Sequence, residues 1–123
     1  MIIALMVAPQ KHPCPTLLCD DGDYLSCAVS RDLDLVGAVS VMYLEDGVAI
    51  LFCRDADWLL GTGNRKVGNR ILAGTFYVVG YEDGKLISLA DDQITRYTLR
   101  FWETELYSSD QVFDSWISSL DEC

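Results

Sequence analysis

The sequence contains a single histidine, and none of its five cysteines forms a CxxC pair. Zinc sites need clustered thiolates or imidazoles, and a catalytic histidine needs a carboxylate that orients it. His12 lies two residues before Cys14 and is followed by Pro13, with no second close pair and no acid at an obvious orienting position. We therefore predict no metal site, no Ser/His or Cys/His catalytic pair and no cofactor.

Long apolar runs are also missing, because no stretch reaches the roughly 18 residues that a membrane-spanning helix requires. Residues 1–11 are apolar but lack a basic start and a small-residue cleavage site, so we expect a first strand there and no signal peptide. The odd number of cysteines is typical of reduced thiols in a cytoplasm. These patterns predict a cytoplasmic protein without membrane contact.

Basic residues are few: 9 Lys and Arg stand against 19 Asp and Glu, and the formal net charge is −10. Phosphate backbones repel such a surface, which argues against direct nucleic-acid binding. The same charge attracts a basic partner and speeds the encounter with it. Simple solubility of a small acidic domain is the alternative, and it stays open.

Half of the residues are hydrophobic and the length suits one domain, so we expect a single domain over 1–123. Strand patterns occupy residues 2–8, 16–19, 35–44, 48–53, 72–81 and 85–89. The turns at 45–47 and 82–84 each contain Asp-Gly, which predicts two hairpins. Residues 23–31 are expected to form a short helix, and residues 54–70 a long connection.

Two helices are predicted in the last third of the chain. The first begins at Ser88 or soon after, because Ser88 with Asp91 fits a capping pattern and Asp91 and Asp92 suit the positive helix end. The second covers 110–120. Its apolar face consists of Val112, Phe113, Trp116, Ile117 and Leu120. We expect this face to be buried on its own sheet, or alternatively in a second copy or a partner. The order of elements predicts an α+β fold: a mostly antiparallel sheet of four to five strands with two main helices packed against it.

Residues 61–70, GTGNRKVGNR, raise the question of a phosphate-binding loop. Two glycines have the Walker spacing, but Asn69 and Arg70 occupy the Lys and Ser/Thr positions. The dinucleotide pattern fails because Lys66 stands where the third glycine should be. We favour a structural loop whose basic groups form exposed ion pairs with nearby acids such as Asp55 and Asp57, each worth about 0–1 kcal/mol. The alternative is a local anion or partner site made of Asn64, Arg65, Asn69 and Arg70.

Residues 35–106 carry four ordered blocks: VGAVSVMYLEDGVAILFC, an NR pair, ILAGTFYVVG and ISLADDQITRYTLRF. In these blocks the chain resembles domain-of-unknown-function family 3846. Members of that family look like phage, plasmid and mobile-element proteins without an assigned chemistry. Here the NR pair occurs twice, at 64–65 and 69–70, in place of the longer loop usual in the family. The resemblance implies a mobile-element context and no particular activity.

Charge and context together predict a non-enzymatic binding protein: a phage-type inhibitor of a host defence nuclease, anti-CRISPR or anti-restriction, that acts by nucleic-acid mimicry in the host cytoplasm. Its partner would be the basic surface of a host nucleic-acid-binding complex, with carboxylates in place of phosphates. The expected contact residues are Glu82, Asp83, Asp91 and Asp92, whose turn and helix start should lie close together, then Asp20, Asp21 and Asp23, then Glu103 and Glu105. Two alternatives are a mobile-element interaction module that dimerises or docks through its C-terminal helix, and an enzyme with the 61–70 loop at its site.

Overall fold

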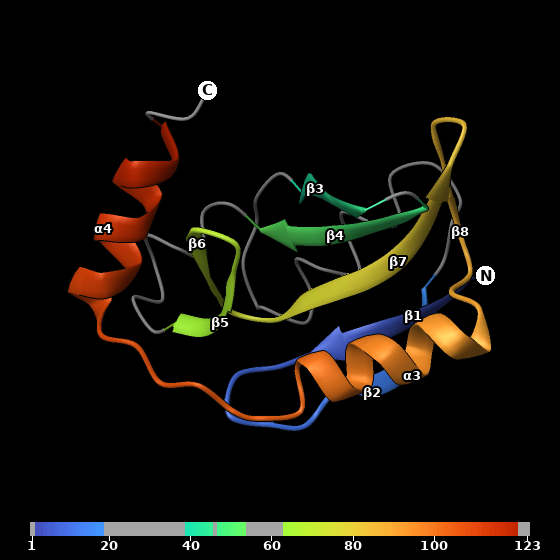
Figure 1. Cartoon of the computed structure of the whole chain (residues 1–123), viewed down its shortest axis with the longest axis horizontal. Helices are drawn as coiled ribbons and strands as arrows, with labels where there is room; N and C mark the ends of the chain where they lie inside the picture. Colours follow the sequence, from blue (N-terminus) through green and yellow to red (C-terminus); the bar gives the residue numbers. More distant parts are fainter. Residues whose placement is uncertain (1, 19–38, 46, 54–62, 121–123) are drawn as a thin grey trace.

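The computed structural model describes residues 2–18, 39–45, 47–53 and 63–120 (Figure 1). Its main sheet is antiparallel and has the strand order β2-β1-β7-β4-β3, with β8 also paired to β7. These strands are β1 (Ile2–Val7), β2 (Cys14–Leu18), β3 (Val39–Glu45), β4 (Val48–Cys53), β7 (Phe76–Glu82) and β8 (Lys85–Ile87). The predicted α+β class is confirmed, but the sheet has six strands where four to five were predicted, because the short β2 and β8 both pair with it.

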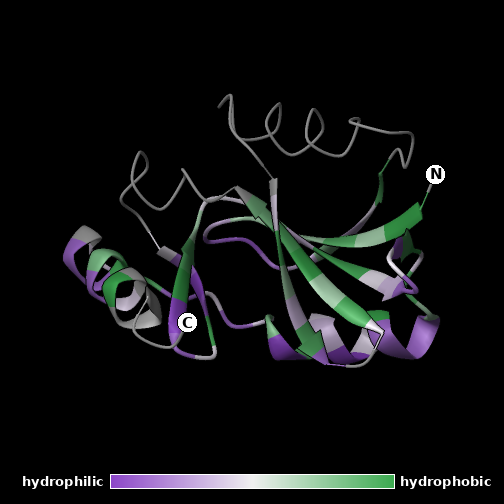
Figure 2. Cartoon of the chain, turned by 90° about the horizontal axis from the view of Figure 1, so that it is seen from above, coloured by the Kyte–Doolittle hydropathy of each residue, from purple (hydrophilic) through white to green (hydrophobic). Residues whose placement is uncertain are grey.

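Side chains of the central strands alternate between the two faces of the sheet, and both faces are buried. On one face Ile50, Phe76 and Val78 pack with Tyr97 of the helix α3 (Asp91–Arg100) and with Phe101, the residue that follows it. The opposite face carries a second buried cluster of Ile2, Ala4, Leu18, Ala49, Leu51, Tyr77 and Val79. Figure 2 shows hydrophobic residues along the strands, while α3 beside them carries hydrophilic residues on its outer side.

Residues 63–73 form a second, two-stranded sheet of β5 (Gly63–Val67) and β6 (Arg70–Ala73). Its turn is Gly68-Asn69, and the φ of +60° at Gly68 is typical of a type II′ turn. The predicted connection over residues 54–70 was therefore wrong for residues 63–70, which form β5, the turn and the start of β6. The predicted single strand 72–81 is likewise divided, because Gly74, at φ +74°, separates β6 from β7.

Helix α3 begins at the predicted place with a different cap. Ala90 is the N-cap residue, and its backbone N–H donates to Oε1 of Gln93 at 2.8 Å. The predicted Ser88 cap is wrong, because the Ser88 Oγ accepts a hydrogen bond from the backbone N–H of Ile3 at 2.9 Å. Ser88 therefore ties the chain before α3 to β1.

The C-terminal helix α4 (Ser109–Leu120) is confirmed, but it packs on the β5–β6 hairpin, away from the main sheet (Figure 1). Val112 is fully buried there, and the Ser115 Oγ accepts from the backbone N–H of Ile71 at 3.0 Å. The predicted burial of the apolar face on the protein's own sheet was wrong, because α4 packs on the hairpin and Phe113 and Ile117 are 46% and 41% exposed. Burial of this face in a second copy or a partner stays a prediction. The side chain of Trp116 lies outside the described part, as does the predicted helix at 23–31.

Candidate functional site

The exposed surface of the described residues is mainly acidic. Its exposed carboxylates belong to Glu45, Glu82, Asp83, Asp91, Asp92, Glu103, Asp110 and Asp114. The exposed cationic side chains are those of Lys11, Lys66, Lys85, Arg96 and Arg100. Predicted contact residues Asp20, Asp21 and Asp23 lie outside the described residues.

Glu82 and Asp83 project from the turn between β7 and β8. Asp83 has φ +53° and Gly84 has φ +77°, the two left-handed conformations of a type I′ turn. Asp tolerates this conformation better than most residues, and Gly has no steric penalty there. The turn chemistry therefore places both acidic residues at an exposed hairpin tip.

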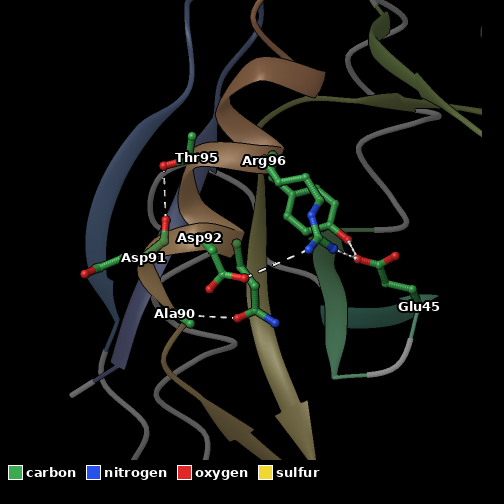
Figure 3. Close-up of polar contacts among 8 residues, drawn as sticks. Glu45, Ala90, Asp91, Asp92, Thr95 and Arg96 are labelled. Atoms are coloured by element: carbon green, nitrogen blue, oxygen red, sulfur yellow. Dashed lines mark hydrogen bonds and ion pairs between the residues drawn. The ribbon is translucent and has the colours of Figure 1, made fainter.

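Asp91 and Asp92 occupy the first turn of α3, where the helix dipole favours negative charge. The Asp91 carbonyl accepts from the Thr95 hydroxyl at 3.1 Å, and the Asp92 carboxylate lies 4.0 Å from a guanidinium nitrogen of Arg96 (Figure 3). Both carboxylates are exposed, and the exposed pair with Arg96 screens only part of the charge of Asp92.

These four acids were predicted to lie close together, but the structure separates them into two pairs, Glu82 with Asp83 and Asp91 with Asp92. Figure 1 shows the β7–β8 turn and the start of α3 at opposite ends of β8. Three strand residues alone extend about 10 Å, and residues 88–90 add to that separation. A partner that contacts both pairs must therefore reach along the β8 edge of the molecule.

Glu45, at the end of β3, was not among the predicted contact residues. Its carboxylate accepts hydrogen bonds from two side chains of α3. Its Oε1 accepts hydrogen bonds from the Tyr97 hydroxyl and from Nη1 of Arg96, the latter at 2.7 Å (Figure 3). These donors hold the pKa of Glu45 below its usual range, and burial, reinforced by Glu45, raises the pKa of Tyr97 to about 12. Glu45 therefore connects β3 to α3 as a carboxylate at neutral pH. No local sequence pattern predicts this contact, because the partners are 51 and 52 residues apart.

The Arg65 side chain is completely buried, which corrects the expectation of an exposed ion pair. Its Nε and Nη2 donate to the carbonyl of Phe101 at 3.1 and 3.0 Å, and Nη2 also donates to the carbonyl of Lys11 at 2.8 Å. Its Nη1 donates to the carbonyl and Oδ1 of Asn64 at 3.1 and 2.8 Å. All five guanidinium donors are thus used within the protein.

Arg65 connects the β5 strand to the end of α3 and to the segment after β1. Phe101 is the C-cap of α3, where carbonyls carry partial negative charge that suits a cation. Burial lowers the pKa of Arg65, and the Glu105 carboxylate acts in the opposite direction. Asn64 completes the link, because its Nδ2 donates to the carbonyls of Val7 and Gly74, both at 2.8 Å. Asn64 and Arg65 together join β1, the β6–β7 junction and the end of α3.

Asn69 and Arg70 have different surroundings from Asn64 and Arg65. Asn69 is exposed in the β5–β6 turn, and Arg70 is half-buried with its guanidinium carbon 4.9 Å from the centroid of the Phe52 ring. The structure therefore does not bring the four predicted loop residues together as one surface site.

Of the remaining predicted acids, Glu103 is exposed and Glu105 is half-buried. The Glu105 Oε1 accepts from the backbone N–H of Lys66 at 3.2 Å and from the Tyr107 hydroxyl. Burial, with a further contribution from Glu105, raises the pKa of Tyr107 to about 12. Glu105 thus has a structural role between β5 and the segment that leads to α4.

Within the described ranges, no three His, Cys, Asp or Glu side chains are grouped so that they could hold a metal ion. In the same ranges, neither α3 nor α4 is long and apolar enough to cross a membrane. Comparison of the chain with protein-family models, curated proteins and solved structures returned no match. The resemblance of residues 35–106 to a mobile-element family therefore stays an expectation.

Proposed function

We propose that this protein is a non-enzymatic acidic binding protein, a phage-type inhibitor that occupies the basic nucleic-acid groove of a host defence nuclease, a CRISPR effector or a restriction enzyme. The observation that carries the proposal is the exposed set of carboxylates at the β7–β8 turn and the start of α3. Both positions have a defined backbone, the hairpin turn and the first turn of α3, so the attachment points of the charges are set before a partner binds. Such pre-organisation lowers the entropy cost of binding.

The placement of the basic residues supports the same proposal. Arg65, inside the hairpin, directs every donor to protein oxygens and adds no charge to the surface. The loop that carried the enzyme alternative thus contains a cation that is already fully hydrogen-bonded. This favours a binding role over chemistry at residues 61–70.

The direct test is DNA cleavage by purified CRISPR and restriction nucleases with and without this protein. We expect inhibition that weakens as salt rises, because exposed charge attraction is screened within about 8–10 Å at physiological ionic strength. D91K/D92K should lose the inhibition, and D110K/D114K on α4 is the matched control, since both double variants change the net charge equally. Unimpaired cleavage throughout the nuclease panel would contradict the proposal, as would equal inhibition by D91K/D92K and wild type.

One observation favours the alternative of an interaction module that docks through α4. Phe113 and Ile117, one helical turn apart, are partly exposed although α4 buries Val112 against the hairpin. Large apolar residues on a protein surface often mark contact sites. If D110K/D114K loses partner binding while D91K/D92K keeps it, α4 is the binding element and the mimicry proposal fails.

A further inference from the structure

The strands at the two ends of the order β2-β1-β7-β4-β3 differ in how they resist pairing with another strand. β2 contains Pro15, which lacks a backbone N–H, and proline is a common means of blocking strand addition at an edge. β3 contains no proline and no lysine in its sequence VSVMYLE. Among the described residues β3 pairs only with β4, and Figure 1 shows it at the upper margin of the sheet.

β3 also exposes large side chains. Val41 is 44% exposed and Tyr43 is 65% exposed, and both point to the same face because they are two residues apart in a strand. The Tyr43 ring is held in an edge-to-face contact with Tyr81 at 5.1 Å between centroids, and the two hydroxyls are 3.2 Å apart. Tyr43 is therefore ordered before any partner binds, which lowers the cost of docking.

We propose that β3 pairs antiparallel with β3 of a second copy about Met42, so that two main sheets join into one across a two-fold axis. This register sets Val41 opposite Tyr43 of the second copy and Tyr43 opposite its Val41. Aromatic and β-branched residues form favourable cross-strand pairs, and a two-fold interface forms this pair twice. The occupant of the β3 edge is thus a second copy of this chain.

The one charge in β3 does not oppose this register. Glu45 is the single charged residue in β3, and its carboxylate is bound by Arg96 at 2.7 Å. Pairing about Met42 places Glu45 opposite Val39 of the second copy, so that like charges do not face each other. The register shift between Tyr43 and Glu45 ends the regular ladder there, which makes the interface short and the dimer dependent on concentration.

The experiment is sedimentation velocity over the micromolar to millimolar range on wild type and two variants. V41K/Y43K sets lysine opposite lysine twice and should abolish the dimer. V41K/Y43E sets lysine opposite glutamate twice and should retain it. A monomeric wild type at all concentrations would overturn the proposal. Dimers of V41K/Y43K would also overturn it, and so would loss of the dimer in both variants.

Hydrogen exchange on the wild-type protein tests the same interface without substitutions. Those amides of residues 40–44 that point away from β4 should become more protected as concentration rises, and protection confined to α4 would overturn the proposal. Salt separates this inference from the proposed function. Two copies of net charge −10 repel each other, so added salt should tighten the dimer while it weakens binding to a basic nuclease.

Discussion

The dipeptide Asn-Arg occurs twice within seven residues, and the two copies have different environments. Asn64 and Arg65 lie inside the molecule and bond to the carbonyls of Val7, Lys11, Gly74 and Phe101. Asn69 is exposed in the turn, and Arg70 lies half-buried over the Phe52 ring. The same residue types thus serve the interior in one place and the surface in the other, because strand position and turn position decide which carbonyls a side chain can reach.

The largest expected effect is the difference between Arg65→Ala and Arg70→Ala. Arg65→Ala removes five hydrogen bonds and leaves the carbonyls of Phe101 and Lys11 without that donor, so it should lower the free energy of unfolding by about 3–4 kcal/mol. Arg70→Ala should cost about 1 kcal/mol, the scale of a cation–π contact near the surface. Urea unfolding at neutral pH measures both. Equal costs for the two substitutions would show that the environments do not differ in energy.

Arg65→Lys sharpens the same comparison. A lysine keeps the charge but has three donors on one nitrogen, so it cannot reproduce the planar fork that bonds Phe101, Lys11 and Asn64 at once. We expect most of the loss seen with alanine, measured in the same urea experiment. Full stability of Arg65→Lys would mean that charge alone accounts for the role of this side chain.

The two asparagines should differ by a smaller amount. Asn64→Ala removes the donors to Val7 and Gly74 and an acceptor of Arg65, which predicts a loss of about 2 kcal/mol. Asn69→Ala, at an exposed turn position, should change stability by about 0.5 kcal/mol or less. Thermal unfolding of both variants provides the measurement. A larger effect at Asn69 than at Asn64 would reverse the assignment of the interior and surface pairs.

Much of the fold follows from local patterns in the sequence. The Asp-Gly hairpins, β1, β4 and both described helices were predicted because apolar periodicity and turn glycines act over a few residues. The β5 strand, GNRKV, was missed because buried polar residues give it no strand pattern. The partners that satisfy Arg65 lie 36 and 54 residues away. Such contacts depend on the complete topology, so a structural loop with exposed ion pairs was favoured where the structure has an internal link.

Arg96 is an exposed arginine that can be compared with the buried Arg65. Loss of its contact with Glu45 should have the smallest effect on stability among these substitutions. Because the folded pKa of Glu45 is below its ordinary value of 4.5, its contribution to stability is present above that pH and is lost as the pH falls through the folded pKa. Glu45→Gln should therefore lower the melting temperature slightly at neutral pH. The difference from wild type should vanish in acid. A difference that persists unchanged well below pH 4.5 would rule out ionisation of Glu45 as its cause.

The most direct test of the central claim compares the acidic surface with the loop in one nuclease inhibition assay. One variant carries Asp83→Lys, Asp91→Lys and Asp92→Lys, and the other carries Asn69→Ala and Arg70→Ala; circular dichroism confirms that both are folded. The acidic-surface account predicts that the triple variant loses inhibition while the loop variant inhibits like wild type. Inhibition that survives the three reversals and disappears with the loop substitutions would contradict it.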